Sequence, residues 1–145
     1  MTPRQLGQRW LSAGGGWAPG MRVLAVPDAP EGERDLESGV TTEPAGPAYV
    51  VHIDADGVTC AWSEYPGTAT GGLCLRDDVP DVSDAATLGA MLGMLRQLSC
   101  TPHAHTRLDS TTRRWYVASG LADLAQTHPT EAEAMVAFAE AWGRR

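Results

Sequence analysis

The chain has 145 residues, a formal net charge of −7 and a hydrophobic content of 43%. These values indicate one globular domain and exclude wholesale disorder, and no apolar run is long enough to cross a membrane as a helix. All eleven basic residues are arginine, and the chain has neither lysine nor asparagine, a bias that indicates GC-rich coding rather than a function.

The charge is unevenly distributed along the sequence. Residues 1–27 hold three arginines and no acid, residues 28–84 hold 13 acids and two arginines, and residues 85–145 hold six arginines and five acids. The middle segment therefore has a net charge of −11. Such a segment repels phosphate backbones and attracts basic protein surfaces. We therefore expect a protein partner with a basic surface, and no direct binding of nucleic acid or membrane.

The first residues have the pattern of a helix. Thr2 is a good cap and Pro3 suits the first helical position. Helical spacing places Leu6, Trp10 and Ala13 on one face, which we expect to be buried.

A strand over 21–26 and a long connection over 27–47 come next. The connection is rich in proline and acids, which prevent one regular element across its whole length. Because such long loops are uncommon in compact domains, we expect it to be mobile, to contain a short strand near 39–42, or to meet a partner.

Residues 48–65 alternate as a β-hairpin does, with a tight turn from Asp54 to Gly57. The side chains expected to face inward are Tyr49, Val51, Ile53, Val58, Cys60 and Trp62. Those expected to face outward are Val50, His52, Thr59, Ala61 and Ser63. A second acidic, loop-rich connection covers 66–82 and includes a candidate edge strand over 73–75.

The strongest helical pattern covers 84–98, with Ser83 or Asp84 as its cap. Its apolar stripe consists of Leu88, Met91, Leu92, Leu95 and Leu98. Gly89 and Gly93 each cost such a helix about 1 kcal/mol relative to alanine, so we expect another element to approach this small face closely.

The remaining residues predict strands over 102–108, 113–118 and 122–127 and a final helix over 131–142, which Thr130 caps. In the strand over 113–118, Trp115 and Val117 are expected to face the core and Arg114 and Tyr116 the solvent. The fold class that follows is α+β: a single domain over 1–145, with an antiparallel sheet of about five or six strands packed by three helices.

Two longer motifs carry a resemblance to a group of proteins. Residues 80–89 follow the pattern P-D-x-x-D-x-A-T-x-G, and residues 129–134 read P-T-E-A-E-A after a strand that contains Trp115. The chain thereby resembles a group of small uncharacterised proteins from bacteriophages and GC-rich bacterial genomes. It departs from them after Arg96, where such proteins tend to have a tryptophan. The resemblance implies a phage or prophage setting and no activity.

Three sets of residues are candidates for a functional site. The acids expected to contact a basic partner are Glu31, Glu33, Asp35, Glu37, Asp77, Asp78 and Asp81. An alternative basic, partly aromatic face, which suits nucleic acid or protects a strand edge, consists of His103, His105, Arg107, Arg114 and Tyr116. A candidate zinc site consists of Cys100, His103 and His105, completed by Cys60, Cys74 or His52.

The leading hypothesis is a non-enzymatic, acidic, phage-associated accessory protein that binds a host or viral protein. One version is a counter-defence inhibitor that mimics the charge of nucleic acid. The alternatives are a small structural or assembly component that forms a homo-oligomer, and a zinc-dependent enzyme. We expect no cofactor. Three cysteines without a C-x-x-C pair, and no signal-peptide pattern, favour the cytoplasm of a bacterial host.

Overall fold

The computed structural model describes residues 1–24, 48–55, 57–62, 71–73 and 78–145, with backbone only at 60–62 and 71–73. In chain order the elements are α1 (Pro3–Ser12), β1 (Arg22–Leu24), β2 (Ala48–Asp54), β3 (Gly57–Trp62), β4 (Gly71–Leu73), β5 (Val79–Pro80), α3 (Ala85–Leu98), β6 (His105–Leu108), β7 (Trp115–Ala118), the 3-10 helix η1 (Ala122–Leu124) and α4 (Glu131–Gly143). The connection over 27–47, with its candidate strand near 39–42, lies outside the described residues.

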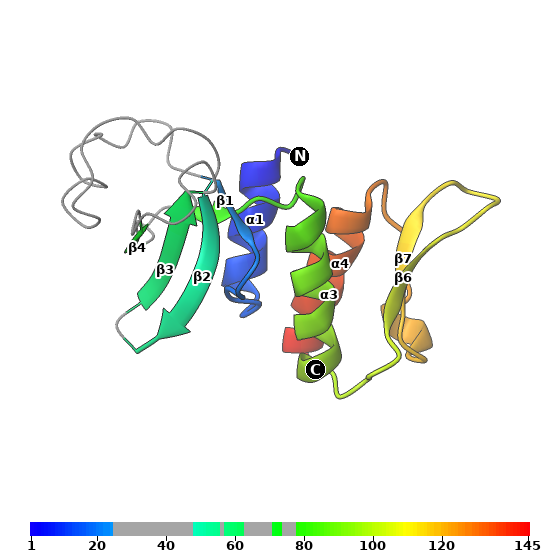
Figure 1. The fold of residues 1–145 in the computed structure, drawn as a ribbon. Coiled ribbons are helices and arrows are strands. Elements are labelled where there is room, and N and C mark those ends of the chain that lie inside the picture. Colours follow the sequence, from blue (N-terminus) through cyan, green and yellow to red (C-terminus); the bar gives the residue numbers. More distant parts are fainter. Residues whose placement is uncertain (25–47, 56, 63–70, 74–77) are drawn as a thin grey trace.

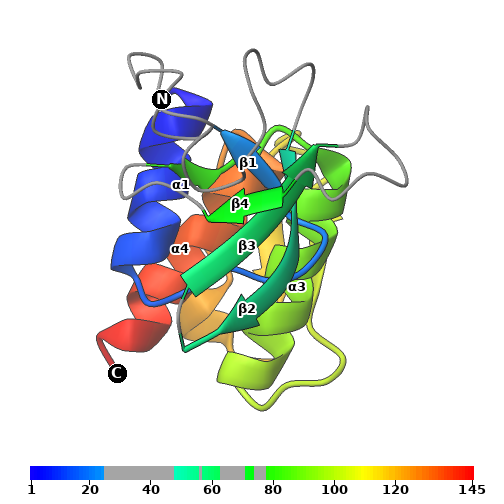
Figure 2. The same cartoon turned by 60° about the vertical axis from the view of Figure 1, so that its left-hand side comes forward.

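The helices form a layer between two antiparallel sheets (Figure 1). One sheet has the strand order β4-β3-β2-β1-β5, and the other is the β6-β7 pair. Figure 2 shows the larger sheet in front of α1, α3 and α4, with the β6-β7 pair behind them. The predicted α+β class, with antiparallel strands and three α-helices, is confirmed, and the strands divide between two sheets because the helical layer is apolar on both sides.

α1 begins as the sequence predicts. The Thr2 hydroxyl accepts the Gln5 N–H at 3.2 Å, and the Gln5 side chain accepts the Thr2 N–H at 2.9 Å. At the other end, the buried Trp10 indole donates to the Gly16 carbonyl at 2.7 Å. A Cβ at Gly15 would lie 2.2 Å from the Trp10 ring, so the turn after α1 closes over this side chain.

α3 has the predicted bounds, with Asp84 as its cap: its carboxylate accepts the Thr87 N–H at 3.0 Å. The inward face is fully buried at Met91 and Leu95. The expectation that another element approaches α3 closely at its two glycines is wrong. A Cβ at either Gly89 or Gly93 would have no atom of the described residues within 4 Å.

The core lies between the larger sheet and the helices. Its largest fully buried side chains are Trp10, Met21, Met91, Leu95, Met135 and Phe138. Alanine occurs at 132, 134 and 139 on the buried part of α4, and such small side chains let neighbouring elements approach it closely. α4 consequently contacts α1, α3, η1 and both strands of the β6-β7 pair.

The predicted inward face of β2 is wrong. Ala48 and Val50 are buried, whereas Tyr49 is half-buried and Val51 is 54% exposed. Ile53 is paired with Val58 but is 38% exposed near the end of the strand. The register with β3 shifts between Val50 and His52, which leaves Val51 as an extra residue. Ala48 and Val50 precede this bulge, so they already face the core before it, and the bulge returns Ile53 to the face that carries Val58. Val58, on β3, packs against the core as expected.

The C-terminal strands differ from the prediction in one place. Val117 is 1% exposed and Trp115 packs against the core, as expected. The strand predicted over 122–127 is wrong: η1 occupies its first part, and only His128 forms a β-bridge, with Trp115. Pro129 follows immediately and has no N–H, so the bridge is not extended by a donor beyond His128.

Candidate functional site

The described part of the chain and the remaining segments differ sharply in charge. Segments 25–47, 56, 63–70 and 74–77 together carry nine acids and two arginines. The described residues carry nine acids and nine arginines. The whole net charge of −7 therefore belongs to those segments, and the described part of the molecule is formally neutral.

The two longest of these segments are joined to one end of the larger sheet. The register pairs Leu24 with Val79 and Ala48 with Trp62, and it places Gly71 opposite the residue before Trp62. Segments 25–47 and 63–70 begin or finish at four of these strand ends, which are Leu24, Ala48, Trp62 and Gly71. The antiparallel topology therefore tethers most of the net charge to a single end of the sheet.

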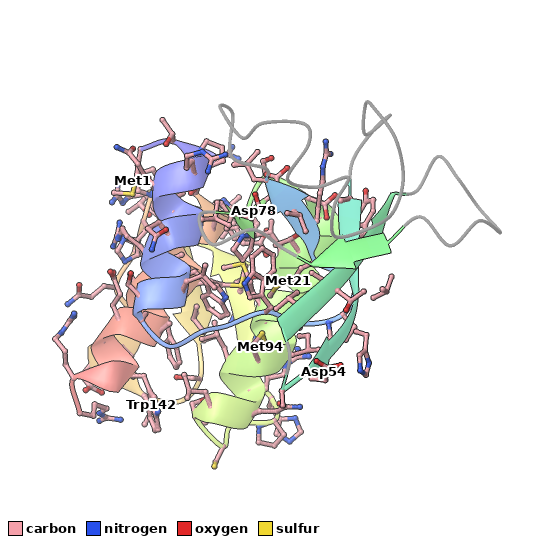
Figure 3. All side chains as sticks on the ribbon, turned by 90° about the vertical axis from the view of Figure 1, so that its left-hand side faces the viewer. Met1, Met21, Asp54, Asp78, Met94 and Trp142 are labelled. Carbon is pink, nitrogen blue, oxygen red and sulfur yellow. The ribbon has the colours of Figure 1, made fainter. Side chains whose placement is uncertain are left out.

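Two of the expected contact acids are buried instead of exposed. Asp78 and Asp81 have relative exposures of 2% and 5%, and Figure 3 shows Asp78 between the first turns of α1 and the sheet. The Asp81 carboxylate accepts both the N–H and the hydroxyl of Ser83, at 3.1 and 2.5 Å, and lies 3.5 Å from the Arg22 guanidinium. These two acids are therefore buried parts of the fold and do not belong to the expected contact surface.

The other expected contact acids lie outside the described residues. They are Glu31, Glu33, Asp35, Glu37 and Asp77.

The alternative basic face is assembled in part on the β6-β7 pair. Arg107 is paired with Tyr116, and His105 lies on the same face two residues before Arg107, opposite the face that carries the buried core residues. Arg114 does not join them, because its guanidinium donates to the hydroxyl and the carbonyl of Thr127, both at 3.2 Å. These bonds hold the Arg114 guanidinium against the segment before α4, while Arg107 stays exposed on the outer face of the pair.

The candidate zinc ligands do not converge. Cys100 is exposed and has a left-handed backbone, with φ of 53°, and the His105 ring is hydrogen-bonded to the His103 carbonyl at 2.9 Å. The residues expected to complete the site are Cys60, Cys74 and His52. His52 lies on the other sheet, beside Asp54. Within the described ranges, no three His, Cys, Asp or Glu side chains are placed to hold a metal ion.

A polar pocket that the sequence reading missed lies between α4, η1 and the segment that joins them. Its volume is about 240 Å³. Buried Phe138 is part of its lining, and the polar side chains around it are Asp123, Gln126, His128, Glu140 and Arg144. These residues come from separate elements, and no spacing motif connects them in the sequence.

An ion pair between helices fixes one wall of this pocket. The Arg9 guanidinium on α1 donates through Nε to Glu140 Oε2 on α4 at 3.1 Å, and through a second nitrogen to Oε1. This contact holds the pKa of Glu140 below its usual value, and it raises that of Arg9. The pair is half-buried and joins positions 131 residues apart, a separation for which local sequence patterns have no signal.

His128 is the second unusual group at this site. Burial lowers the pKa of its imidazole below the usual value, although the nearby Glu133 carboxylate acts in the opposite direction. The Glu133 Oε2 atom is itself buried, and it has no hydrogen-bond partner among the described residues. Among the described residues, Glu133 supplies no return hydrogen bond to the start of α4. The Thr130 hydroxyl caps the helix alone, by accepting the Glu133 N–H at 3.1 Å.

Comparisons with protein families, curated proteins and solved structures found no match to this chain. Among the described residues, no helix has the length and apolar character that crossing a membrane requires.

Proposed function

We propose that this protein is a non-enzymatic accessory protein of a phage or prophage that binds a basic protein surface in the bacterial cytoplasm. The observation that carries the proposal is the separation of charge. A formally neutral α+β body is joined, mainly at one end of one sheet, to segments that hold the net charge of −7. This arrangement suits recognition by charge, because the acidic segments supply a concentrated negative field.

The partner's chemistry follows from the sign and density of this charge. Segment 28–43 contains six acids and one arginine and has no lysine. A surface that normally binds nucleic acid has the complementary property, a concentration of arginine and lysine spaced for phosphates. We therefore favour the version in which the acidic segments compete with nucleic acid for such a surface.

The contact residues of the proposal are fewer than those expected from sequence. Asp78 and Asp81 are buried, so reversing their charge would disturb the fold rather than test an interface. The proposal rests on the acids that remain, which are Glu31, Glu33, Asp35, Glu37 and Asp77.

A charge-matched pair of variants tests this function. The test variant carries Glu31→Gln, Glu33→Gln and Glu37→Gln. The control carries Asp54→Asn, Asp109→Asn and Asp123→Asn, which alters the net charge equally in the described body. The tagged proteins are used to capture partners from bacterial lysate at about 0.1 M salt, where exposed charges are only partly screened. The Kd of the recovered partner is then measured for wild type and both variants.

We expect the test variant to weaken binding about tenfold and the control to weaken it much less, because charges at an interface act more strongly than distant ones. A short DNA duplex should displace the protein from its partner. Equal effects of the two variants, or binding that DNA leaves unchanged, would contradict recognition by charge mimicry.

A structural component that self-associates is the second candidate function. It is favoured by two large apolar side chains, Val51 and Ile53, which are exposed at the outer end of β2. Light scattering distinguishes it from the first proposal: an oligomer that persists in high salt and dissociates in Val51→Ser supports assembly, and a monomer at all concentrations opposes it. The zinc-dependent enzyme is not carried forward, since its ligands do not converge among the described residues.

A further inference from the structure

The pocket that is lined by His128 contains polar side chains that have no hydrogen-bond or ion-pair partner among the described residues. Its two carboxylates are already paired, Glu140 with Arg9 and Asp123 with Arg145 at 3.2 Å. Their negative charges are therefore compensated by cations outside the pocket lining. The class of ligand that the pocket can bind therefore depends on the lining side chains that are not paired with another group.

Three side chains in the lining, those of Gln126, His128 and Arg144, make no hydrogen bond or ion pair within the described part of the chain. The backbone of His128 is held by two hydrogen bonds of 2.7 Å to Trp115, so its ring is positioned while its nitrogens stay available. Arg144 directly follows α4 and lines the same pocket as Glu140.

These groups form a site for an anion. A guanidinium, an imidazole N–H and an amide N–H are all donors, and charge-assisted bonds from arginine to an anion are about twice as strong as bonds between neutral groups. The carbonyl end of α4 contributes a negative partial charge at this place, and Arg144 and Arg145 both offset it. Phe138 and Leu124 supply an apolar wall for the remainder of a ligand.

We propose that this pocket binds a small organic carboxylate with an apolar side chain. Its volume of about 240 Å³ is below the range of pockets for drug-sized ligands, which starts at roughly 300 Å³, so the ligand is a small metabolite. The pocket is built only from α4, η1 and their connection, and it does not involve the acidic segments. The inference is therefore independent of the proposed function.

A broader hollow of about 750 Å³ beside α1 carries no comparable inference. Its lining is mainly apolar, Arg9 is already bonded to Glu140, and Arg4 has a partner as well. No set of available polar groups converges there.

The test uses benzoate as the probe, with neutral benzamide as its isostere and inorganic phosphate as a second anion. Binding to the full chain is followed by NMR chemical shifts of the backbone amides of Gln126, His128 and Arg144. We expect saturable millimolar binding of benzoate and weaker binding of benzamide. Tighter binding of phosphate than benzoate would overturn the carboxylate assignment, and so would the absence of a saturable shift with benzoate.

Two variants and a control assign the interaction to the pocket. Arg144→Gln should weaken benzoate binding by at least about fivefold, because it removes a charged hydrogen bond. Arg107→Gln removes an exposed arginine from the β6-β7 pair and should leave the affinity unchanged. Asp123→Asn removes a negative charge from the lining and should strengthen binding. Weaker binding in Asp123→Asn, or unchanged binding in Arg144→Gln, would overturn the proposal.

Discussion

Two glycines in similar sequence contexts, Leu6-Gly7 and Leu88-Gly89, have opposite surroundings. A Cβ at Gly7 would lie 2.5 Å from the Pro80 carbonyl oxygen, whereas a Cβ at Gly89 would meet nothing within 4 Å. Gly7 therefore allows α1 to pack directly against β5, and Gly89 has no such role. Sequence patterns predicted both helices but could not distinguish the two glycines, because the difference comes from the neighbouring element.

The first prediction concerns Gly7. Gly7→Ala should lower the free energy of unfolding by roughly 1–3 kcal/mol, because the new methyl group overlaps a backbone oxygen that has little freedom to move. Urea denaturation at neutral pH measures the effect. An unchanged or raised stability would mean that β5 does not pack against α1 as described.

At the scale of elements, the sequence was most informative about helix ends. Thr2 and Thr130 were expected as caps, and Asp84 was one of two candidates beside Ser83; each of the three accepts a hydrogen bond from the backbone of its helix. Capping is a local interaction over three residues, so the sequence contains its full signal. The facing of β2 was not predictable in the same way, because each of its two alternating sets contains a valine and packing in the core decides that Val50 is the buried one.

The second prediction concerns α3. Gly89→Ala and Gly93→Ala should each raise the free energy of unfolding by about 0.5–1 kcal/mol, because alanine has the higher helix propensity and the added methyl groups have room. The same denaturation experiment measures both, with Gly7→Ala as the contrasting variant. A loss of stability in either would show that this face of α3 is covered after all.

At the scale of the whole molecule, the stability of the fold depends on pH through ionisable groups that lie between the helices and the C-terminal strands. His128 has the neutral Gln126 beside it in the pocket lining, and its charged neighbours are Arg9 on α1, Arg114 before β7, and Glu133 and Glu140 on α4. Burial outweighs the two carboxylates, so the folded protein disfavours the protonated ring.

The third prediction follows from this shift. The pKa of His128 is lower in the folded than in the unfolded chain. The contribution of this side chain to the free energy of unfolding is therefore fully present above about pH 6.5, and it is lost as the pH falls toward the folded pKa. Stability should therefore decline on mild acidification, before the carboxylates protonate. Denaturation curves between neutral and mildly acidic pH measure this decline. His128→Gln should abolish it, and an unchanged decline in that variant would contradict the assignment to His128.

The sequence by itself determined the three helices and their caps, the antiparallel hairpins and the position of the acidic segments along the chain. Each of these depends on residues close together in the sequence, through side-chain periodicity, turn chemistry or the order of charges. Only the tertiary structure decided that Asp78 and Asp81 are buried, that Arg9 pairs with Glu140, and that His128 and Arg144 line one pocket. These facts depend on strand register and helix packing, which bring distant residues together and leave no local pattern in the sequence.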